Sequence, residues 1–128
     1  MKLLRIGKIK TPYKEIAQCP KNISDDGPVC ILEVDDVYVK GLSGMNELKY
    51  IQVLYWFEGV DRELMVQKKR GTGPLTGTFA LRSPHRPNPI AVADVLVDRV
   101  EGNKVYVRGL DCLDGTVLLD IKISRERK

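Results

Sequence analysis

The chain reads IAVADVLVDRV over residues 90–100, EGN over residues 101–103 and KVYVRGL over residues 104–110. The two outer segments are rich in Val, Ile and Tyr, and apolar residues recur at alternate positions, as in a strand with one buried face. The connection between them contains Gly and Asn, which tight hairpin turns favour. This stretch therefore predicts a β-hairpin and indicates an antiparallel sheet.

Other segments of the chain also have the composition of strands. They cover residues 3–9, 29–34, 49–57 and 117–123, with a shorter one at residues 78–81. Helical periodicity is scarce, and residues 35–45 leave room for only one or two turns. Short strands separated by turn signals are typical of a small closed sheet. We therefore expect a mostly β fold, a small antiparallel β-barrel with few short helical turns, as one domain over residues 1–128.

Composition limits the class of protein. The 128 residues suit one domain, and an apolar fraction of 43% is enough for one core. No run has the length of a membrane span, and residues 1–10 lack the apolar stretch of a signal peptide, so we expect a cytoplasmic protein. Three scattered cysteines and a single histidine indicate neither a metal site nor a disulfide framework.

The net charge of +4 is mild, but the basic residues are clustered. Lys68, Lys69 and Arg70 form one run, and residues 125–128 supply two arginines and a lysine. Clusters of this kind are able to follow the phosphates of a nucleic acid. Solvated charges without a partner are the alternative and the more common case.

A polar and proline-rich loop, GTFALRSPHRPN, covers residues 77–88 and is followed by Pro89 and Ile90. We call residues 77–88 the proline loop. Its prolines stiffen the backbone and rule out a helix or a central strand. The side chains that it offers for hydrogen bonds are Arg82, Ser83, His85, Arg86 and Asn88. A stiff loop with these groups suits a preorganised ligand site, whereas a surface turn that satisfies its own backbone is the alternative.

A second polar segment, GLDCLDGTVLLDIK, covers residues 109–122. Asp114 and Gly115 form its turn, and Asp111 and Asp120 lie on either side. An ordinary hairpin with an Asp-Gly turn explains this pattern. A turn with three carboxylates is also able to hold an amine or a ribose, or to accept a proton.

These two segments together resemble those of a known family. Most of the chain is similar to the TrmO/YaeB-like proteins, which are S-adenosylmethionine-dependent tRNA methyltransferases with a TsaA-like β-barrel. The similarity lies in the proline loop through Ile90, in residues 109–122, in IG and TPYKE within residues 6–15, and in LYWF at residues 54–57. A Pro, Arg and Asn cluster of this order rarely arises by chance.

The resemblance implies methyl transfer from S-adenosylmethionine to the exocyclic nitrogen of a threonylcarbamoyl-adenosine beside the tRNA anticodon. It also implies a homodimer whose site lies near the subunit contact, with no metal. By this analogy the cofactor pocket is lined by Arg82, Ser83, Pro84, His85, Arg86, Asn88, Leu110, Asp111, Leu113, Asp114, Gly115 and Thr116. Phe79 adds an apolar surface for the adenine.

Individual roles follow from side-chain chemistry. Arg82 or Arg86 suits a carboxylate of the cofactor or a tRNA phosphate, through a bidentate pair of hydrogen bonds. Candidate catalytic bases are Asp114, Asp120 and His85. For His85, a hydrogen-bonded loop histidine is an equally good interpretation. The residues that we expect to contact tRNA are Arg86, Lys122, Lys68, Lys69 and Arg70.

Two further functions fit the same pattern. The barrel is able to methylate a substrate other than tRNA, or to bind the cofactor without catalysis. Lys49 and Tyr50 stand where members of the family commonly carry Ser and His, which is the feature that favours the non-catalytic module. A steep salt dependence of tRNA binding distinguishes a nucleic-acid substrate from a small one, and a non-catalytic module should bind the cofactor and transfer no methyl group.

Overall fold

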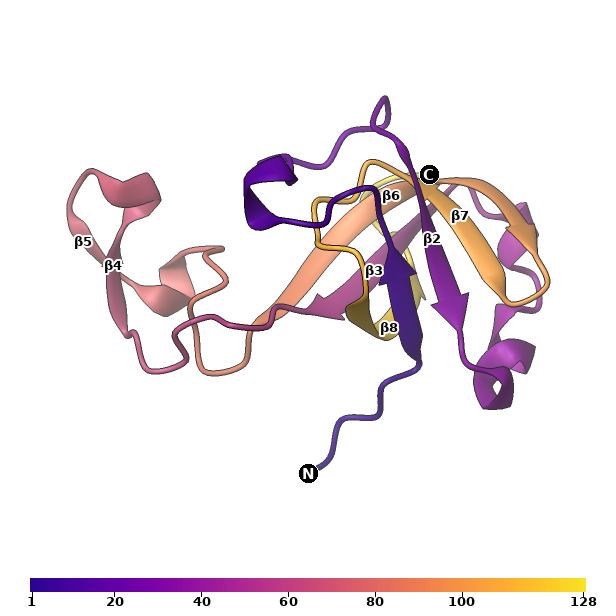
Figure 1. Cartoon of the computed structure of the whole chain (residues 1–128), viewed down its shortest axis with the longest axis horizontal. Helices are drawn as coiled ribbons and strands as arrows, with labels where there is room; N and C mark the ends of the chain where they lie inside the picture. The colour runs from indigo at the N-terminus through magenta and orange to yellow at the C-terminus, as the bar shows by residue number, and fades with distance from the viewer.

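The computed structural model describes residues 1–128 with the exception of the Arg70 side chain. Six strands form a closed barrel in the order β1-β2-β7-β6-β3-β8 (Figure 1). These strands are β1 (Gly7–Lys10), β2 (Val29–Val34), β3 (Tyr50–Trp56), β6 (Ile90–Glu101), β7 (Lys104–Arg108) and β8 (Thr116–Ile123). Neighbouring strands are antiparallel throughout the barrel. The expected fold class is confirmed.

The β6–β7 hairpin forms as the sequence predicts. Glu101 pairs with Lys104, which leaves Gly102 and Asn103 as a two-residue turn. Gly102 has a φ of 59°, a left-handed conformation that glycine adopts without a steric penalty. The Asn103 side-chain nitrogen donates to the Val34 carbonyl over 3.1 Å, so the turn is also tied to the end of β2.

Two local predictions are wrong. Residues 78–81 form no strand, because Thr78–Ala80 is a 3-10 helix closed by a hydrogen bond from the Leu81 N–H to the Thr78 carbonyl. The first strand begins at Gly7 and not at residue 3. Leu3 and Leu4 are 51% and 65% exposed, so of the apolar residues before Gly7 only Ile6 packs against the core.

The remaining helical structure consists of short 3-10 helices. They are η1 (Ile16–Gln18), η2 (Asp36–Leu42), η3 (Met45–Glu47), η4 (Lys69–Gly71) and η5 (Thr78–Ala80). The second of these lies in the segment where one or two turns are predicted. In the part of the chain that the structure describes, no helix has the length and apolar character needed to cross a membrane.

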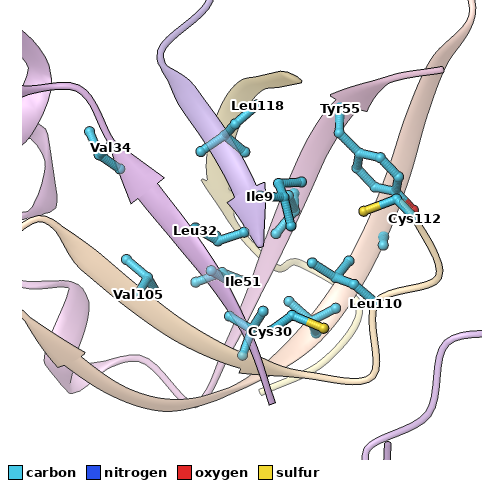
Figure 2. Packing of buried hydrophobic residues seen from close by; sticks show 14 of the residues in the cluster. Ile9, Cys30, Leu32, Val34, Ile51, Tyr55, Val105, Leu110, Cys112 and Leu118 are labelled. Carbon is cyan, nitrogen blue, oxygen red and sulfur yellow. The ribbon is translucent and has the colours of Figure 1, made fainter. Parts of the chain in front are cut away.

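The barrel interior is filled by alternate residues of its strands (Figure 2). In β2, Cys30, Leu32 and Val34 are buried, whereas the residues between them are partly exposed. Side chains alternate across a strand, so these three face the same interior. Leu110 and Cys112, from the connection between β7 and β8, are fully buried and pack in the region of Tyr55 (Figure 2).

An arm of residues 57–89 projects from the barrel between β3 and β6 (Figure 1). It contains a small hairpin of β4 (Val66–Lys68) and β5 (Leu75–Gly77), which pair with each other in a separate two-stranded sheet. The sequence pattern does not predict these strands, because each has three residues and no buried face. The arm also carries η4, η5 and the proline loop.

Candidate functional site

A cleft of about 720 Å³ lies between the proline loop and the barrel. Its walls come from the proline loop, the end of β3 with Phe57, the start of β6, and Asp111. Lys21 and Asn22, in the connection between β1 and β2, complete the lining. Segments that are distant in sequence thus converge on one concavity, which has the size of a small-molecule site.

Arg86 clamps the proline loop internally. Its Nη2 atom donates to the carbonyls of Thr78 (2.8 Å) and Leu81 (3.0 Å). Hydrogen bonds from a charged donor are stronger than neutral ones, so this side chain holds η5 and the following turn together. Arg86 also lines the cleft.

Two residues that were not sequence candidates fasten the loop to the β4–β5 hairpin. The Gln67 side-chain nitrogen donates to the Thr78 hydroxyl (2.9 Å) and to the His85 carbonyl (2.8 Å). The Thr78 hydroxyl donates in turn to the Leu64 carbonyl over 2.7 Å, and Thr78 is only 1% exposed. Gln67 belongs to no predicted element, and Thr78 opens a segment whose pattern indicates a strand, so no local signal marks this contact in the sequence.

His85 lines a second cavity, of about 620 Å³, together with Lys68 and Lys69. Its Nδ1 atom accepts a hydrogen bond from the Asp61 backbone N–H over 3.0 Å. A neutral imidazole that accepts at Nδ1 carries its proton on Nε2. This arrangement favours the interpretation of His85 as a hydrogen-bonded loop histidine, and its role as a base stays a prediction.

Tyr55 and Asp111 form a hydrogen-bonded pair that lines the cleft. The Tyr55 hydroxyl donates to Asp111 Oδ1 over 2.6 Å, and Tyr55 is 2% exposed. Burial, and then the charge of Asp111, raise the pKa of Tyr55 far above its ordinary value, so the hydroxyl keeps its proton and remains a donor. Tyr55 was not a sequence candidate, because a tyrosine in an apolar strand is indistinguishable from a core residue.

The strand register changes at Tyr55. Leu54 pairs with Asp120 and Tyr55 with Leu118, so the β3–β8 ladder has a bulge between these positions. Bulges bend a strand and redirect its side chains, and they are frequent beside active sites. The bulge therefore lies at Tyr55, whose hydroxyl donates to Asp111.

Phe79 and Arg82 belong to the exposed part of the cleft lining. Phe79 is 80% exposed, which is unusual for a large aromatic side chain. Arg82 is exposed as well, and its Nη2 atom lies 3.3 Å from the Val92 carbonyl. Ser83 and Pro84 lie between the two cavities and line both. The structure thus brings six of the candidate residues together around the cleft, namely Phe79, Arg82, Ser83, Pro84, Arg86 and Asp111. Their role in cofactor binding stays a prediction.

The aspartate turn is divided between two environments. Asp111 lines the cleft, whereas Asp114 accepts a hydrogen bond from the Thr11 N–H (3.0 Å) and pairs with the Lys14 ammonium. The hydrogen bond from Lys14 is the main cause that holds the pKa of Asp114 below its ordinary range. Asp114 therefore joins the turn to the TPYKE segment near the N-terminus.

Several candidates lie outside the lining of the cleft. Leu110 is fully buried in the core. Asp120 and Lys122 are exposed on β8 and form an ion pair of 3.6 Å with each other. The other candidates in this group are His85, Asn88, Leu113, Asp114, Gly115 and Thr116. Their roles in cofactor binding or catalysis stay predictions.

The basic clusters have different positions. Lys68 and Lys69 line the second cavity, and the Arg70 side chain, a further tRNA candidate, lies outside the described residues. Arg127 forms a bidentate ion pair with Asp25 (3.0 and 2.7 Å), and its guanidinium lies 4.1 Å from the centre of the Tyr50 ring. One C-terminal arginine is thus used to attach the chain end to the barrel. Within the described residues, no group of three or more His, Cys, Asp or Glu is placed to hold a metal ion.

The chain is similar to several known proteins. The model of the tRNA-methyltransferase O N-terminal domain matches residues 8–124. A probable S-adenosyl-L-methionine-binding protein, VirR of Rhizobium radiobacter, is 43% identical over 123 residues, which are 96% of this chain and 70% of that protein. A tRNA (adenine(37)-N6)-methyltransferase of Mus musculus is 40% identical over 84 residues, 63% of this chain and 20% of that enzyme. A crystal structure of TrmO has a TM-score of 0.80 at 28% identity, and the match covers 97% of this chain and 57% of that one.

Proposed function

Because the chain belongs to the family of the tRNA-methyltransferase O N-terminal domain, we propose that it is an S-adenosylmethionine-dependent methyltransferase that acts on tRNA. The observation that carries the proposal is the convergence of the proline loop and Asp111 on one cleft. Both belong to segments that carry the family resemblance, and they meet only in the folded chain. The chain spans about a fifth of the mouse enzyme's length, so the activity is proposed for this domain on the strength of its own cleft.

The residues of the cleft fit the chemical groups of the cofactor. A volume of about 720 Å³ lies within the range of roughly 300–1,000 Å³ that is usual for small-molecule sites. Arg82 and Lys21 offer positive charge to a carboxylate, and Asp111 offers negative charge to a cation. Phe57 and the exposed Phe79 offer apolar faces to an adenine.

The bound cofactor supplies an activated methyl group, and the chain supplies alignment and exclusion of water. Orienting two reactants in a near-attack geometry is worth about 7–11 kcal/mol of the barrier. The stiff proline loop, held by Arg86, is suited to this task because its backbone is fixed before the ligand binds. We propose the exocyclic nitrogen of a threonylcarbamoyl-adenosine beside the anticodon as the methyl acceptor.

The second cavity supports the choice of tRNA as substrate. No carboxylate lines it among the described residues, and Lys68, Lys69 and Arg82 give it positive charge. It shares the wall formed by residues 80–84 with the cofactor cleft. A phosphate bound there would place the nucleotide chain next to the methyl donor. Affinity for tRNA should then fall steeply with added salt, in proportion to the number of phosphates contacted.

Exposed apolar residues of the arm support a homodimer. Met65, Val66, Leu75 and Phe79 are 46%, 53%, 67% and 80% exposed. Exposed apolar side chains are typical of protein interfaces where they lie together, and Val66 and Leu75 belong to the paired strands β4 and β5. Phe79 also lines the cleft. We propose that two copies meet through their arms in the cytoplasm, close to the two sites. Sedimentation equilibrium of the wild type and of Leu75→Lys tests this, since the variant should be monomeric.

The decisive test has two stages. Calorimetric titration with S-adenosylmethionine should show about one site per subunit. Transfer of a labelled methyl group to tRNA with and without the threonylcarbamoyl modification then identifies the acceptor. Cofactor binding without transfer to either tRNA would leave the non-catalytic module, in keeping with the name of the VirR relative, or methylation of a substrate other than tRNA. A folded protein that binds no cofactor would contradict the proposal.

The candidate base Asp114 is tested in the same assay. Asp114→Asn removes the charge that pairs with Lys14 and keeps the size of the side chain. If the aspartate turn takes part in the reaction, this variant should have lower turnover or cofactor affinity. Wild-type kinetics would assign Asp114 to the structure of the turn alone.

A further inference from the structure

The cleft has an uneven distribution of charge. Of the described residues that line it, Lys21, Arg82 and Arg86 are cationic, and Asp111 provides the single carboxylate. Three positive groups repel any cation that enters, so a cationic ligand atom has one favourable position, beside Asp111. A ligand with charges of both signs is oriented by this asymmetry.

Tyr55 orients the Asp111 carboxylate for contact with a cationic ligand atom. Its hydroxyl donates to Oδ1 over 2.6 Å, and no described residue donates a hydrogen bond to the other oxygen, Oδ2. Tyr55 is almost completely buried and its ring packs against Phe57, with centroids 5.7 Å apart. The donor is therefore immobile and restrains the rotation of the carboxylate, while one oxygen stays available to a ligand.

The surroundings of Asp111 distinguish between two kinds of cation. An ammonium group has three N–H donors and requires several acceptors once it leaves water. A sulfonium has no donor, so a carboxylate beside aromatic rings satisfies it without further partners. Tyr55 and Phe57 provide the rings, and Asp111 is the carboxylate. The site matches a sulfonium better than an ammonium.

We propose that Asp111, positioned by Tyr55, recognises the positive sulfur of the methyl donor and thereby distinguishes the donor from the demethylated product. This inference rests on the proposed function. Methyl transfer breaks the S–CH₃ bond, and its electron pair stays on sulfur, which becomes a neutral thioether. The new bond forms to the acceptor nitrogen, and the proton that this nitrogen loses passes to water. The charge that Asp111 attracts exists only before the transfer, so the product is held less tightly and leaves.

The experiment compares two ligands that differ by this one charge. Calorimetry measures the affinities of the wild type, Asp111→Asn and Tyr55→Phe for S-adenosylmethionine and for S-adenosylhomocysteine. Asn keeps the shape of the side chain and an oxygen that accepts from Tyr55. We expect Asp111→Asn to lose at least about tenfold in affinity for the sulfonium ligand, which corresponds to 1.4 kcal/mol, and less than about threefold for the thioether. Tyr55→Phe should also lower the ratio of the affinity for S-adenosylmethionine to that for S-adenosylhomocysteine, by a smaller factor than Asp111→Asn.

A matched control separates charge recognition from general effects. Asp98→Asn changes the net charge by the same amount on the exposed part of β6, where Asp98 pairs with Arg108. It should leave both affinities unchanged. Equal losses for the two ligands in Asp111→Asn and Tyr55→Phe would show a merely structural role and overturn the inference. A folded wild type that binds neither ligand would overturn the proposed function itself, which is a distinguishable result.

Discussion

In the barrel, Leu32, Ile51 and Val105 are fully buried, whereas in the arm Val66 and Leu75 are more than half exposed. Of the described arm residues 57–89, only Thr78 and Pro89 are buried. The barrel is thus stabilised by removing apolar surface from water, which is the dominant favourable contribution to folding. The arm has almost no apolar core of its own.

The arm is held instead by hydrogen bonds from a few side chains to the backbone. Gln67, Thr78 and Arg86 make most of these contacts within the arm. Regions with few buried apolar contacts open locally at a lower free energy than the global unfolding. The proposed site therefore has two walls that are stabilised in different ways. The barrel wall, with Tyr55 and Asp111, depends on the apolar core, and the arm wall depends on its own hydrogen bonds.

The largest effect is expected from a cavity in the barrel. Leu32→Ala should lower the free energy of unfolding by about 2–5 kcal/mol, because the lost burial and the cavity both contribute. Urea denaturation followed by circular dichroism measures it. Leu75→Ala in the arm is the matched control. In the monomer, at a protein concentration below that of dimer formation, it should change stability by less than about 0.5 kcal/mol since its side chain is 67% exposed. Equal losses of stability in Leu32→Ala and Leu75→Ala would contradict the difference between barrel and arm.

The clamp in the arm should give the next largest effect, and a local one. Arg86→Ala removes hydrogen bonds from a charged donor, which contribute about 1.5–3 kcal/mol each in partly buried settings. We expect faster amide exchange in the arm, weaker cofactor binding, and a barrel that melts at nearly the same temperature. Arg86→Lys keeps the charge without the planar guanidinium. Its amide exchange and cofactor affinity should lie between those of the wild type and Arg86→Ala. Uniformly faster exchange in the barrel strands would show that the arm is not a separate unit.

The pH dependence of stability should come from the barrel. Burial raises the pKa of Cys112 from 9.0 to about 12, so the folded thiol keeps a proton that the unfolded chain loses. Stability should therefore fall as the pH rises from about 9 toward 12, by at most about 1.4 kcal/mol per pH unit for this group. Urea denaturation at several alkaline pH values measures the slope. Cys112→Ala should give a shallower slope, and an unchanged slope would exclude this thiol as a source.

The smallest effect on stability is expected at Phe79. Its side chain is 80% exposed, so Phe79→Ala should change the free energy of unfolding by less than about 0.5 kcal/mol. The same variant should bind S-adenosylmethionine more weakly, because an apolar face of the cleft is lost. Thermal denaturation and calorimetry on one preparation test both statements. A large loss of stability would indicate that Phe79 belongs to an apolar core, and would contradict the contrast between a buried barrel core and an exposed arm.

Local patterns in the sequence were sufficient for much of the barrel. β2 has the predicted bounds, and the β6–β7 hairpin has its expected Gly-Asn turn, because alternation and turn chemistry are properties of neighbouring residues. The β4–β5 hairpin was missed, since strands of three residues without a buried face carry no such pattern. The proline loop was recognised as stiff and polar, yet its attachment through Gln67 was not predictable from its own composition.

The sequence alone determined that a small antiparallel barrel carries a rigid polar loop, and it identified the family. It left Asp111, Asp114 and Asp120 as similar candidates, because all three belong to one short segment. The tertiary structure separated them: Asp111 meets Tyr55 at the cleft, Asp114 pairs with Lys14, and Asp120 is exposed on β8. The physical reason is barrel closure, since pairing of β8 with both β1 and β3 decides which distant side chains become neighbours, and no local pattern records that choice.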